Sequence, residues 1–265
     1  MCDAYFGRLL DYFDEHDLWR DTALILTTDH GFLLSEHEWW GKNRMPYYEE
    51  ISHIPLFVYH PEFAGEGGKR RSMLTQTIDL MPTLLDVFGI APPPEVRGHS
   101  LLPCLGDVRQ LREIGIFGMF GGPIGATDGR FAYYLFAQDL LAPRLYEYTL
   151  MPTHLRTMFT PEELRTAALA EPFDFTKGAP VLRYDALPHA MRAPMHDFRG
   201  FGDVGTVLFD LAADPRQERP LRDEAIEVRL KAGIAAVLQA HDAPDELFAR
   251  YGVGTRPDSH PIRGG

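Results

Sequence analysis

Two short unbroken apolar runs in the first sixty residues predict strands of a sheet. Residues 23–28 read Ala-Leu-Ile-Leu followed by two threonines, and residues 54–59 read Ile-Pro-Leu-Phe-Val-Tyr. Runs of this length are too short for a buried helix, and they suit strands covered on both faces of a parallel sheet. Pro55 stands near the start of the second run, where a missing N–H does least harm. We therefore expect two buried strands in this part of the chain.

Apolar residues at helical spacing predict amphipathic helices over residues 3–17, 75–88 and 223–240. Gly89 is expected to end the second of these helices, and Pro82 to kink it or mark a break after its first turn. The apolar positions of this helix that are expected to face inward are Ile78, Met81, Leu84, Leu85 and Phe88.

From about residue 113 the pattern changes to strand-like runs separated by glycine-rich turns. The runs cover residues 114–120, 130–136, 181–184 and 206–211. Asp128-Gly129 is typical of a hairpin turn, and Thr160-Pro-Glu-Glu163 of a capped helix start. We expect an α/β part over residues 1–110, a smaller α+β part with an antiparallel sheet over 111–252, and a disordered tail over 253–265.

Composition narrows the class of protein. The chain has 265 residues, 45% of them hydrophobic and 24% charged, which is typical of a soluble globular protein. A net charge of −12 argues against binding of nucleic acid, which needs basic surface. No apolar run reaches the length of a membrane span, and the chain does not begin with a signal-peptide pattern. Cys2 and Cys104 alone do not form a disulfide framework, which favours a cytoplasmic setting unless the chain is a truncated form that has lost an export signal.

Candidate chemistry follows the first predicted strand directly. Asp29, His30 and Gly31 stand at its carboxyl end, where ligands of open α/β sheets collect. A carboxylate oxygen and an imidazole nitrogen can share one divalent cation, and glycine lets the backbone pass close beneath such a site. The alternative is that Asp29 caps the next turn and that His30 is an ordinary surface histidine.

The loop that follows, residues 34–44, adds a second candidate group. Lys42 comes after two tryptophans and a glycine, and a lysine there can reach a tetrahedral oxyanion as a compact positive charge. Trp40 and Asn43 are candidate substrate-binding residues, with packing and plain solvent exposure as the alternatives. His37 lies near the site in sequence, and both a catalytic role and a structural role in holding the loop stay open.

The order and spacing of several motifs resemble the second half of the catalytic domain of sulfatases, which belong to the alkaline-phosphatase superfamily. These motifs are Asp29-His30-Gly31, Glu36-His37, Trp40-Gly41-Lys42 and Ile54-Pro55-Leu56. Weaker similarity covers nearly all of the remaining chain apart from residues 140–200. The resemblance implies an α/β fold: part of an alkaline-phosphatase-like mixed or parallel sheet flanked by helices, followed by a smaller α+β subdomain with an antiparallel sheet.

The resemblance also implies roles and a cofactor. Asp29 and His30 match the family's second pair of metal ligands, and Lys42 matches the lysine that contacts the sulfate and the leaving-group oxygen. The expected metal is Ca²⁺, with Mg²⁺ or Mn²⁺ as alternatives. The family's nucleophile is a formylglycine made from Cys or Ser in a Cys/Ser-x-Pro-Ser-Arg motif. Cys2 is followed by Asp-Ala-Tyr and Cys104 by Leu-Gly-Asp, so neither lies in that motif.

We therefore expect a sulfatase-like protein that hydrolyses sulfate esters of small molecules or carbohydrates, with this polypeptide inactive by itself. The expected partner is a missing N-terminal half, or a second copy of the chain. His30 stands where many sulfatases have asparagine, which leaves a phosphonate or phosphodiester hydrolase as an alternative. The other alternative is a non-catalytic homologue that binds an anionic sugar or a partner chain.

Overall fold

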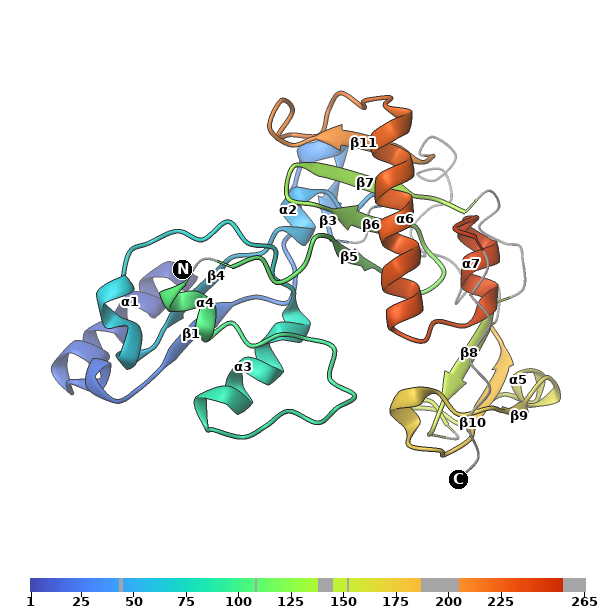
Figure 1. The fold of residues 1–265 in the computed structure, drawn as a ribbon, viewed down its shortest axis with the longest axis horizontal. Helices are drawn as coiled ribbons and strands as arrows, with labels where there is room; N and C mark the ends of the chain where they lie inside the picture. Colours follow the sequence, from blue (N-terminus) through green and yellow to red (C-terminus); the bar gives the residue numbers. More distant parts are fainter. Residues whose placement is uncertain (43–44, 108, 138–144, 152, 187–204, 255–265) are drawn as a thin grey trace.

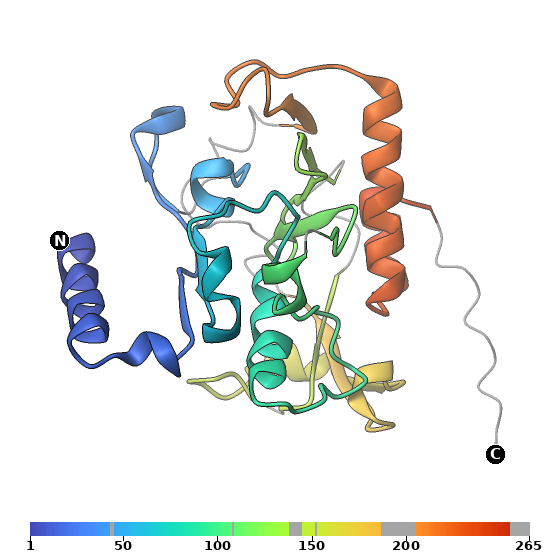
Figure 2. The ribbon, with the colours of Figure 1, turned by 60° about the vertical axis from the view of Figure 1, so that its left-hand side comes forward.

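The computed structural model describes residues 1–42, 45–107, 109–137, 145–151, 153–186 and 205–254. Most elements before residue 110 lie on one side of the molecule, and a four-stranded sheet with a long helix lies on the other (Figure 1). Figure 2 shows the first helix and this long helix at opposite sides of the molecule. The elements before residue 110 are α1 (Cys2–Glu15), β1 (Leu24–Thr27), β2 (Leu33–Leu34), β3 (Trp40–Gly41), α2 (Glu49–Ser52), β4 (Leu56–Tyr59), α3 (Leu80–Val87) and α4 (Pro103–Gly106).

Both predicted strands of the first part are present, but their expected environment is wrong. β1 and β4 pair with one another in antiparallel orientation, from Leu24 opposite Tyr59 to Thr27 opposite Leu56. All four residues of β1 are half-buried, and Phe57 of β4 is 64% exposed. Within the described residues each strand has one ladder partner, so neither strand is covered as a central parallel strand would be.

The expected inward face of the second helix is also wrong. Residues 77–79 form a 3-10 turn that leads into α3, and Pro82 sits in the first turn of α3, where its missing N–H does least harm. The buried residues are Asp79, Pro82 and Thr83, because the loop at residues 98–101 packs on that face. The apolar positions face away from that loop, with Leu84 49% and Phe88 75% exposed.

The second part is built on the antiparallel sheet that the sequence predicted. Its strands run in the order β11-β7-β6-β5, and Asp128-Gly129 lies in the hairpin between β6 and β7. The predicted runs correspond to β5, β7, β10 and β11, whereas β6 and the shorter strands β8 and β9 were missed. The elements after residue 110 are β5 (Gly115–Gly118), β6 (Ile124–Thr127), β7 (Phe131–Leu135), β8 (Tyr146–Thr149), α5 (Pro161–Arg165), β9 (Ala168–Ala170), β10 (Val181–Asp185), β11 (Val207–Asp210), α6 (Glu224–Ala240) and α7 (Asp245–Tyr251).

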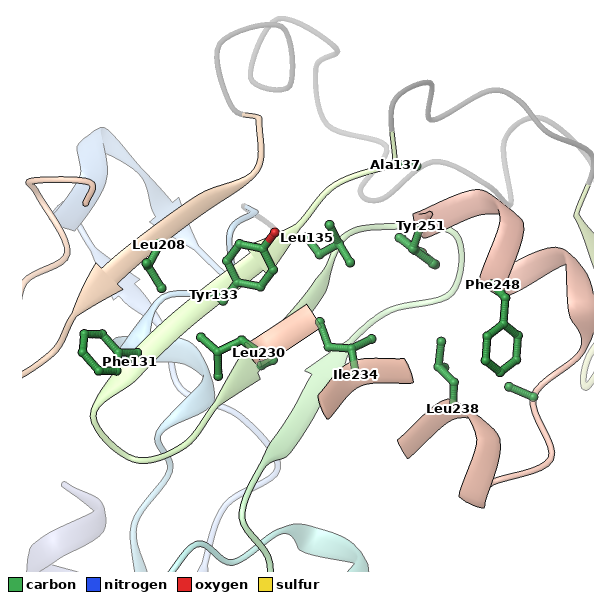
Figure 3. Close-up of a cluster of buried hydrophobic side chains, with 12 residues drawn as sticks. Phe131, Tyr133, Leu135, Ala137, Leu208, Leu230, Ile234, Leu238, Phe248 and Tyr251 are labelled. Carbon is green, nitrogen blue, oxygen red and sulfur yellow. The ribbon is translucent and has the colours of Figure 1, made fainter. Parts of the chain in front are cut away.

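Alternation along β7 gives the sheet two buried faces. Phe131, Tyr133 and Leu135 point toward α6 and α7, where they pack with Leu230 and Ile234 (Figure 3). This is the main hydrophobic core of the chain, and the predicted helix over residues 223–240 covers it as α6.

The opposite face of the same sheet packs on a segment of the first part. Ala132, Tyr134 and Phe136 form a second buried cluster with Met45 and Tyr48. Both residues lie in the short segment that leads into α2, so the second part of the chain supports the stretch that follows the candidate site. This packing is the main connection between the two parts that bears on function.

A smaller sheet completes the described fold, with strands in the order β8-β10-β9. The predicted capping box is confirmed, because the Thr160 hydroxyl accepts the Glu163 N–H and the Glu163 carboxylate accepts the Thr160 N–H. The predicted disordered tail lies outside the described residues from residue 255 onward, and α7 directly precedes it. None of the described helices has the length and apolar character needed to cross a membrane.

Candidate active site

Asp29 and His30 follow β1 after one intervening threonine. The Asp29 carboxylate accepts hydrogen bonds from the His30 backbone N–H at 3.0 Å and from the Thr28 hydroxyl at 3.3 Å. Its other oxygen, Oδ2, lies 3.2 Å from His30 Nε2. The Asp29 side chain is 80% exposed and the His30 side chain 34% exposed, so both groups are open to a ligand from solvent.

The His30 imidazole has one arrangement of protons that satisfies its neighbours. Nδ1 lies 2.9 Å from the Gly31 carbonyl oxygen, which only accepts, so Nδ1 carries the proton and donates it. Nε2 lies 2.6 Å from Lys42 Nζ, an ammonium group that only donates, so Nε2 offers its lone pair. A histidine fixed by a hydrogen bond from Nδ1 to a backbone carbonyl presents Nε2 in the form that binds metal ions.

Electrostatics keep Asp29 in its charged form. Partial desolvation acts to raise the pKa of the Asp29 carboxyl, but the electrostatic influence of the adjacent His30 ring and hydrogen bonds from backbone N–H groups and Thr28 outweigh it. The pKa of Asp29 therefore lies below its ordinary value. A carboxylate oxygen and an imidazole lone pair 3.2 Å apart are stabilised by a positive charge beside them, and Lys42 supplies that charge in this structure.

Gly31 fixes this pair of residues onto α2. Its N–H donates to the Ile51 carbonyl oxygen at 2.8 Å. A Cβ atom at Gly31 would lie 1.8 Å from the Glu50 carbonyl oxygen, far inside any real contact distance. Glycine is thus required here by the close approach of two backbones, whereas the sequence analysis attributed it to a backbone passing close beneath a metal site.

The turn that carries His37 contacts residues at the start of α2. The His37 backbone has φ +52°, and its imidazole stacks on the Tyr48 ring with centroids 3.5 Å apart. The His37 side chain is 10% exposed, and its Nε2 lies 3.6 Å from Glu50 Oε2. These contacts fit the structural role for His37 that the sequence left open, while its catalytic role stays a prediction.

The other two predicted substrate-binding residues are Trp40 and Asn43. Trp40 lies in β3, opposite Leu34 of β2, and its side chain is 69% exposed. This exposure leaves the Trp40 ring open to solvent and to a substrate. Asn43, the other predicted substrate-binding residue, lies outside the described residues, and its role stays a prediction.

Two buried residues that contact the site's support were missed by the sequence analysis. The Gln217 side chain accepts the Glu49 N–H at 2.7 Å and donates to the Tyr134 hydroxyl at 3.0 Å. The Tyr134 hydroxyl in turn donates to the Tyr47 carbonyl oxygen at 2.8 Å. Gln217 has φ +53°. It stands in a run of polar residues after β11, and nothing in that run indicates a buried amide. Its partner Glu49 is 168 residues away in the sequence.

The residues present fit a divalent cation in part. Asp29 and His30 offer two donors that converge on the same point, which suits one side of a metal site. Within the part of the chain that the structure describes, no three side chains of His, Cys, Asp or Glu cluster so as to hold a metal ion. Since Ca²⁺ takes about 6–8 oxygen ligands, further donors must come from elsewhere.

Comparison with known proteins finds similarity to one family in the segment that carries these residues. The family model described as Sulfatase matches residues 2–90. An N-acetylglucosamine-6-O-sulfatase of Bacteroides thetaiotaomicron is 37% identical over 103 residues, 39% of this chain and 18% of that protein. Human arylsulfatase K is 36% identical over 106 residues, again 39% of this chain and 19% of that protein. The chain thus spans about a fifth of the length of these curated relatives.

Solved structures extend the similarity of fold to nearly the whole chain. A protein from the glycosaminoglycan metabolism of Bacteroides thetaiotaomicron aligns with a TM-score of 0.57 and 18% identity, covering 94% of this chain and 44% of that one. A protein in complex with its substrate D-glucosamine-2-N,6-O-disulfate aligns with a TM-score of 0.53 and 19% identity, covering 96% of this chain and 39% of that one. The expected fold class, part of an alkaline-phosphatase-like fold, is confirmed.

Proposed function

We propose, on the premise that residues 2–90 belong to the sulfatase family, that this chain supplies one side of the active site of a sulfuric ester hydrolase. One observation carries the proposal. Three side chains that the family motifs single out, those of Asp29, His30 and Lys42, are in contact, although Lys42 is 12 residues away from His30.

In this proposal Asp29 and His30 hold the divalent metal from one side, Ca²⁺ foremost, with Mg²⁺ or Mn²⁺ as alternatives. When bound, the metal supplies positive charge to the oxygens of the sulfate group. The lowered pKa of Asp29 keeps that residue an anionic ligand at neutral pH, and the Nδ1–H bond to Gly31 holds Nε2 of His30 in the acceptor form. Lys42 moves from His30 to the sulfate, where its ammonium group neutralises negative charge that develops in the transition state.

The other predicted residues take supporting roles. Trp40 offers an exposed aromatic face on which a sugar or aryl ring can pack, and Asn43 is proposed to contact the same substrate. His37 is proposed to hold the turn between β2 and β3, with direct catalysis as the second possibility for this residue.

The proposed substrate class is a sulfated carbohydrate or other small sulfate ester. Support comes from the similarity to the N-acetylglucosamine-6-O-sulfatase of Bacteroides thetaiotaomicron. A phosphonate or phosphodiester substrate is the second candidate. A multifunctional alkaline phosphatase superfamily protein, PehA of Trinickia caryophylli, is 36% identical over 105 residues, 40% of this chain and 20% of that protein, and His30 replaces the asparagine of many sulfatases.

We further propose that a separate polypeptide segment completes the site and supplies the formylglycine nucleophile. The exposed apolar side chains of the first part support this proposal, since a ridge of this kind is typical of a surface that packs on other protein. On α1, and on α3 with the residues that flank it, they are Tyr5, Leu9, Tyr12, Ile78, Met81, Leu84 and Phe88. A second copy of the chain is the alternative occupant, which light scattering of the purified chain distinguishes.

The core of the proposal is tested by ligand titration of the chain itself. With ¹⁵N-labelled histidine, added Ca²⁺ is expected to shift the His30 ring resonances, and Asp29→Ala is expected to abolish the shift. Asp21→Ala, which removes an exposed carboxylate just before β1, is the matched control and is expected to change nothing. Equal responses in all three proteins would contradict the metal-binding roles.

Activity forms the second arm of the test. The chain alone, with Ca²⁺ and an aryl sulfate, is expected to show no hydrolysis above background. A longer polypeptide that includes the Cys/Ser-x-Pro-Ser-Arg motif is expected to hydrolyse the sulfate, and Lys42→Ala to lower its kcat at least ~10²-fold, as loss of an oxyanion-stabilising group does. Faster hydrolysis of an aryl phosphonate than of the sulfate would favour the second candidate substrate.

A further inference from the structure

The Gln217 amide joins the two parts of the molecule at the start of α2. Gln217 is 2% exposed and Tyr134 is 1% exposed, so the hydrogen bonds between them lie away from solvent. The Gln217 carbonyl oxygen accepts the N–H of Glu49, the first residue of α2, and its NH₂ group donates to the Tyr134 hydroxyl on β7. Tyr134 then donates to the Tyr47 carbonyl oxygen. The backbone on either side of Tyr48 is thereby fixed to the four-stranded sheet.

Short contacts continue from α2 to the site residues. Glu50 follows Glu49, and its carbonyl oxygen lies so close to Gly31 that a Cβ there would approach to 1.8 Å. Ile51 accepts the Gly31 N–H at 2.8 Å. Gly31 in turn accepts the Nδ1–H of His30, the bond that orients the imidazole toward Lys42. Every step of this path is a backbone contact or a hydrogen bond, so a displacement of α2 displaces Gly31 with it.

We propose that Gln217 is a positioning residue for the site: by holding the start of α2 against the second part of the chain, its amide sets the orientation of His30 beside Asp29 and Lys42. The proposal rests on the proposed function of these three residues as one side of a metal and sulfate site. Gln217 acts through α2 and Gly31, and it touches neither metal nor substrate.

The same hydrogen bonds would also exist if Gln217 only stabilised the fold. A purely structural residue affects all amides of the second part together, because removing its bonds lowers the free energy of global unfolding. A positioning residue instead loosens the path from Glu49 to Gly31 while α6 keeps its protection. Amide hydrogen exchange resolved by residue separates these two roles.

The test compares the full chain with Gln217→Met, which keeps the length of the side chain and removes both hydrogen bonds. Exchange of the Glu49 amide is expected to accelerate about 10-fold or more, as loss of a buried hydrogen bond implies. The Gly31 amide is expected to accelerate with it, while the Leu230 and Ile234 amides of α6 stay unchanged. Gln239→Met, at an exposed position of α6, is the matched control and is expected to leave all these amides as they are.

A conservative variant covers the case in which Gln217→Met does not fold. Gln217→Glu keeps an oxygen that accepts the Glu49 N–H, and is expected to retain protection at Glu49 and Gly31. The positioning role would be overturned by unchanged exchange of Gly31 in Gln217→Met. It would equally be overturned by acceleration of the α6 amides in step with Gly31.

A Ca²⁺ titration of the same proteins separates this proposal from the proposed function. Weaker Ca²⁺ binding in Gln217→Met than in the parent chain supports both. If the parent chain gives no Ca²⁺ response at His30, the proposed metal site is contradicted, and the exchange of Gly31 alone then decides whether Gln217 positions this segment.

Discussion

The two parts of the chain obtain their order in different ways. In the second part, Leu230 and Ile234 of α6 are fully buried in the core that includes side chains of β7 (Figure 3). In the first part, α3 has an equally clear apolar stripe, but Leu84 and Phe88 remain 49% and 75% exposed. The first part relies instead on polar contacts such as the ion pair of the buried Asp79 with Arg112, a residue just past the boundary at residue 110, whose atoms approach to 2.6 Å.

This difference indicates which contacts hold the candidate site residues in place. Asp29, His30 and Lys42 belong to the part with few buried apolar residues, yet the backbone beneath them rests on the second part. Tyr48 packs in the cluster of Tyr134 and Phe209, and α2 follows directly after it. The second part is therefore a support for the site as well as a neighbouring unit.

The largest expected loss of stability comes from removing the Asp79 carboxylate, which pairs with Arg112. Asp79 is fully buried and receives two hydrogen bonds from Arg112, so Asp79→Ala leaves a buried guanidinium without its partner. A loss of about 3–5 kcal/mol in the free energy of unfolding of this part is expected. Urea unfolding followed by tryptophan fluorescence measures it, because all three tryptophans lie within the first 40 residues. Asp107→Ala, at an exposed pair 3.8 Å from Arg109, is the control and should change stability by less than about 0.5 kcal/mol.

A comparable loss confined to the other part is expected from Leu230→Ala. Leu230 of α6 is fully buried against the sheet. Truncation of such a leucine lowers the free energy of unfolding by about 2–5 kcal/mol. Circular dichroism at 222 nm reports all helices, of which α6 is the longest one described, so its midpoint should fall more than that of the tryptophan signal. Val228→Ala, at a 61% exposed position two residues away, should leave both signals in place. Equal shifts of the two signals for Leu230→Ala would show that the parts unfold as one.

Low pH is expected to lower the free energy of unfolding of the first part through protonation of Asp79. The loss should be gradual and smaller than that of Asp79→Ala. Burial acts to raise the pKa of Asp79, but hydrogen bonds from Arg112 and from the backbone N–H groups of His99 and Gln76 outweigh it and hold the pKa below its ordinary value. The stabilisation is therefore fully present above the unfolded pKa of about 3.9 and is lost as the pH falls through the lower folded pKa. The tryptophan signal of the parent chain should lose stability below about pH 4, and Asp79→Asn should flatten that dependence. An unchanged slope in Asp79→Asn would assign the acid sensitivity to other carboxylates.

The smallest effect on stability is expected from a substitution at Leu84, one of the exposed apolar residues of α3. Leu84→Gln removes apolar surface that is already half in water, and the free energy of unfolding should change by less than about 0.5 kcal/mol. Self-association should fall instead, as measured by light scattering over a range of chain concentrations. The buried counterpart Leu230→Gln should unfold α6 outright. A loss of stability for Leu84→Gln as large as that of Leu230→Ala would show that the ridge is buried by the chain itself.

Local patterns predicted most elements of the fold, and the failures have a common physical origin. Alternation and turn residues identified β7 and its hairpin, and the capping box at Thr160 placed α5. The apolar stripe of α3 was real but was assigned to the wrong face, because burial depends on which loop packs on the helix. The motif residues Asp29, His30 and Lys42 lie in contact, and the roles inferred for them from the sequence stay predictions.

What sequence reasoning missed at the site depends on contacts between distant residues. Gln217 and Tyr134 lie 83 residues apart and meet only because β7 pairs with β11 and the chain then turns back. A polar glutamine after a strand gives no sign that its amide is satisfied in the interior. Such contacts depend on which distant strands pair, and the local spacing of apolar residues does not indicate that pairing.

The pairing of β1 with a single neighbour has a geometric consequence for any strand that is added to it. Within the described residues, the edge of β1 away from β4 has no ladder partner, and β1 ends two residues before Asp29. Interstrand hydrogen bonding sets a spacing of about 4.7–4.9 Å. A strand that binds along this edge would therefore bring its own terminal side chains to about that distance from Asp29, within reach of an ion held there. The backbone of β1 thus fixes in advance the separation at which further ligands can arrive.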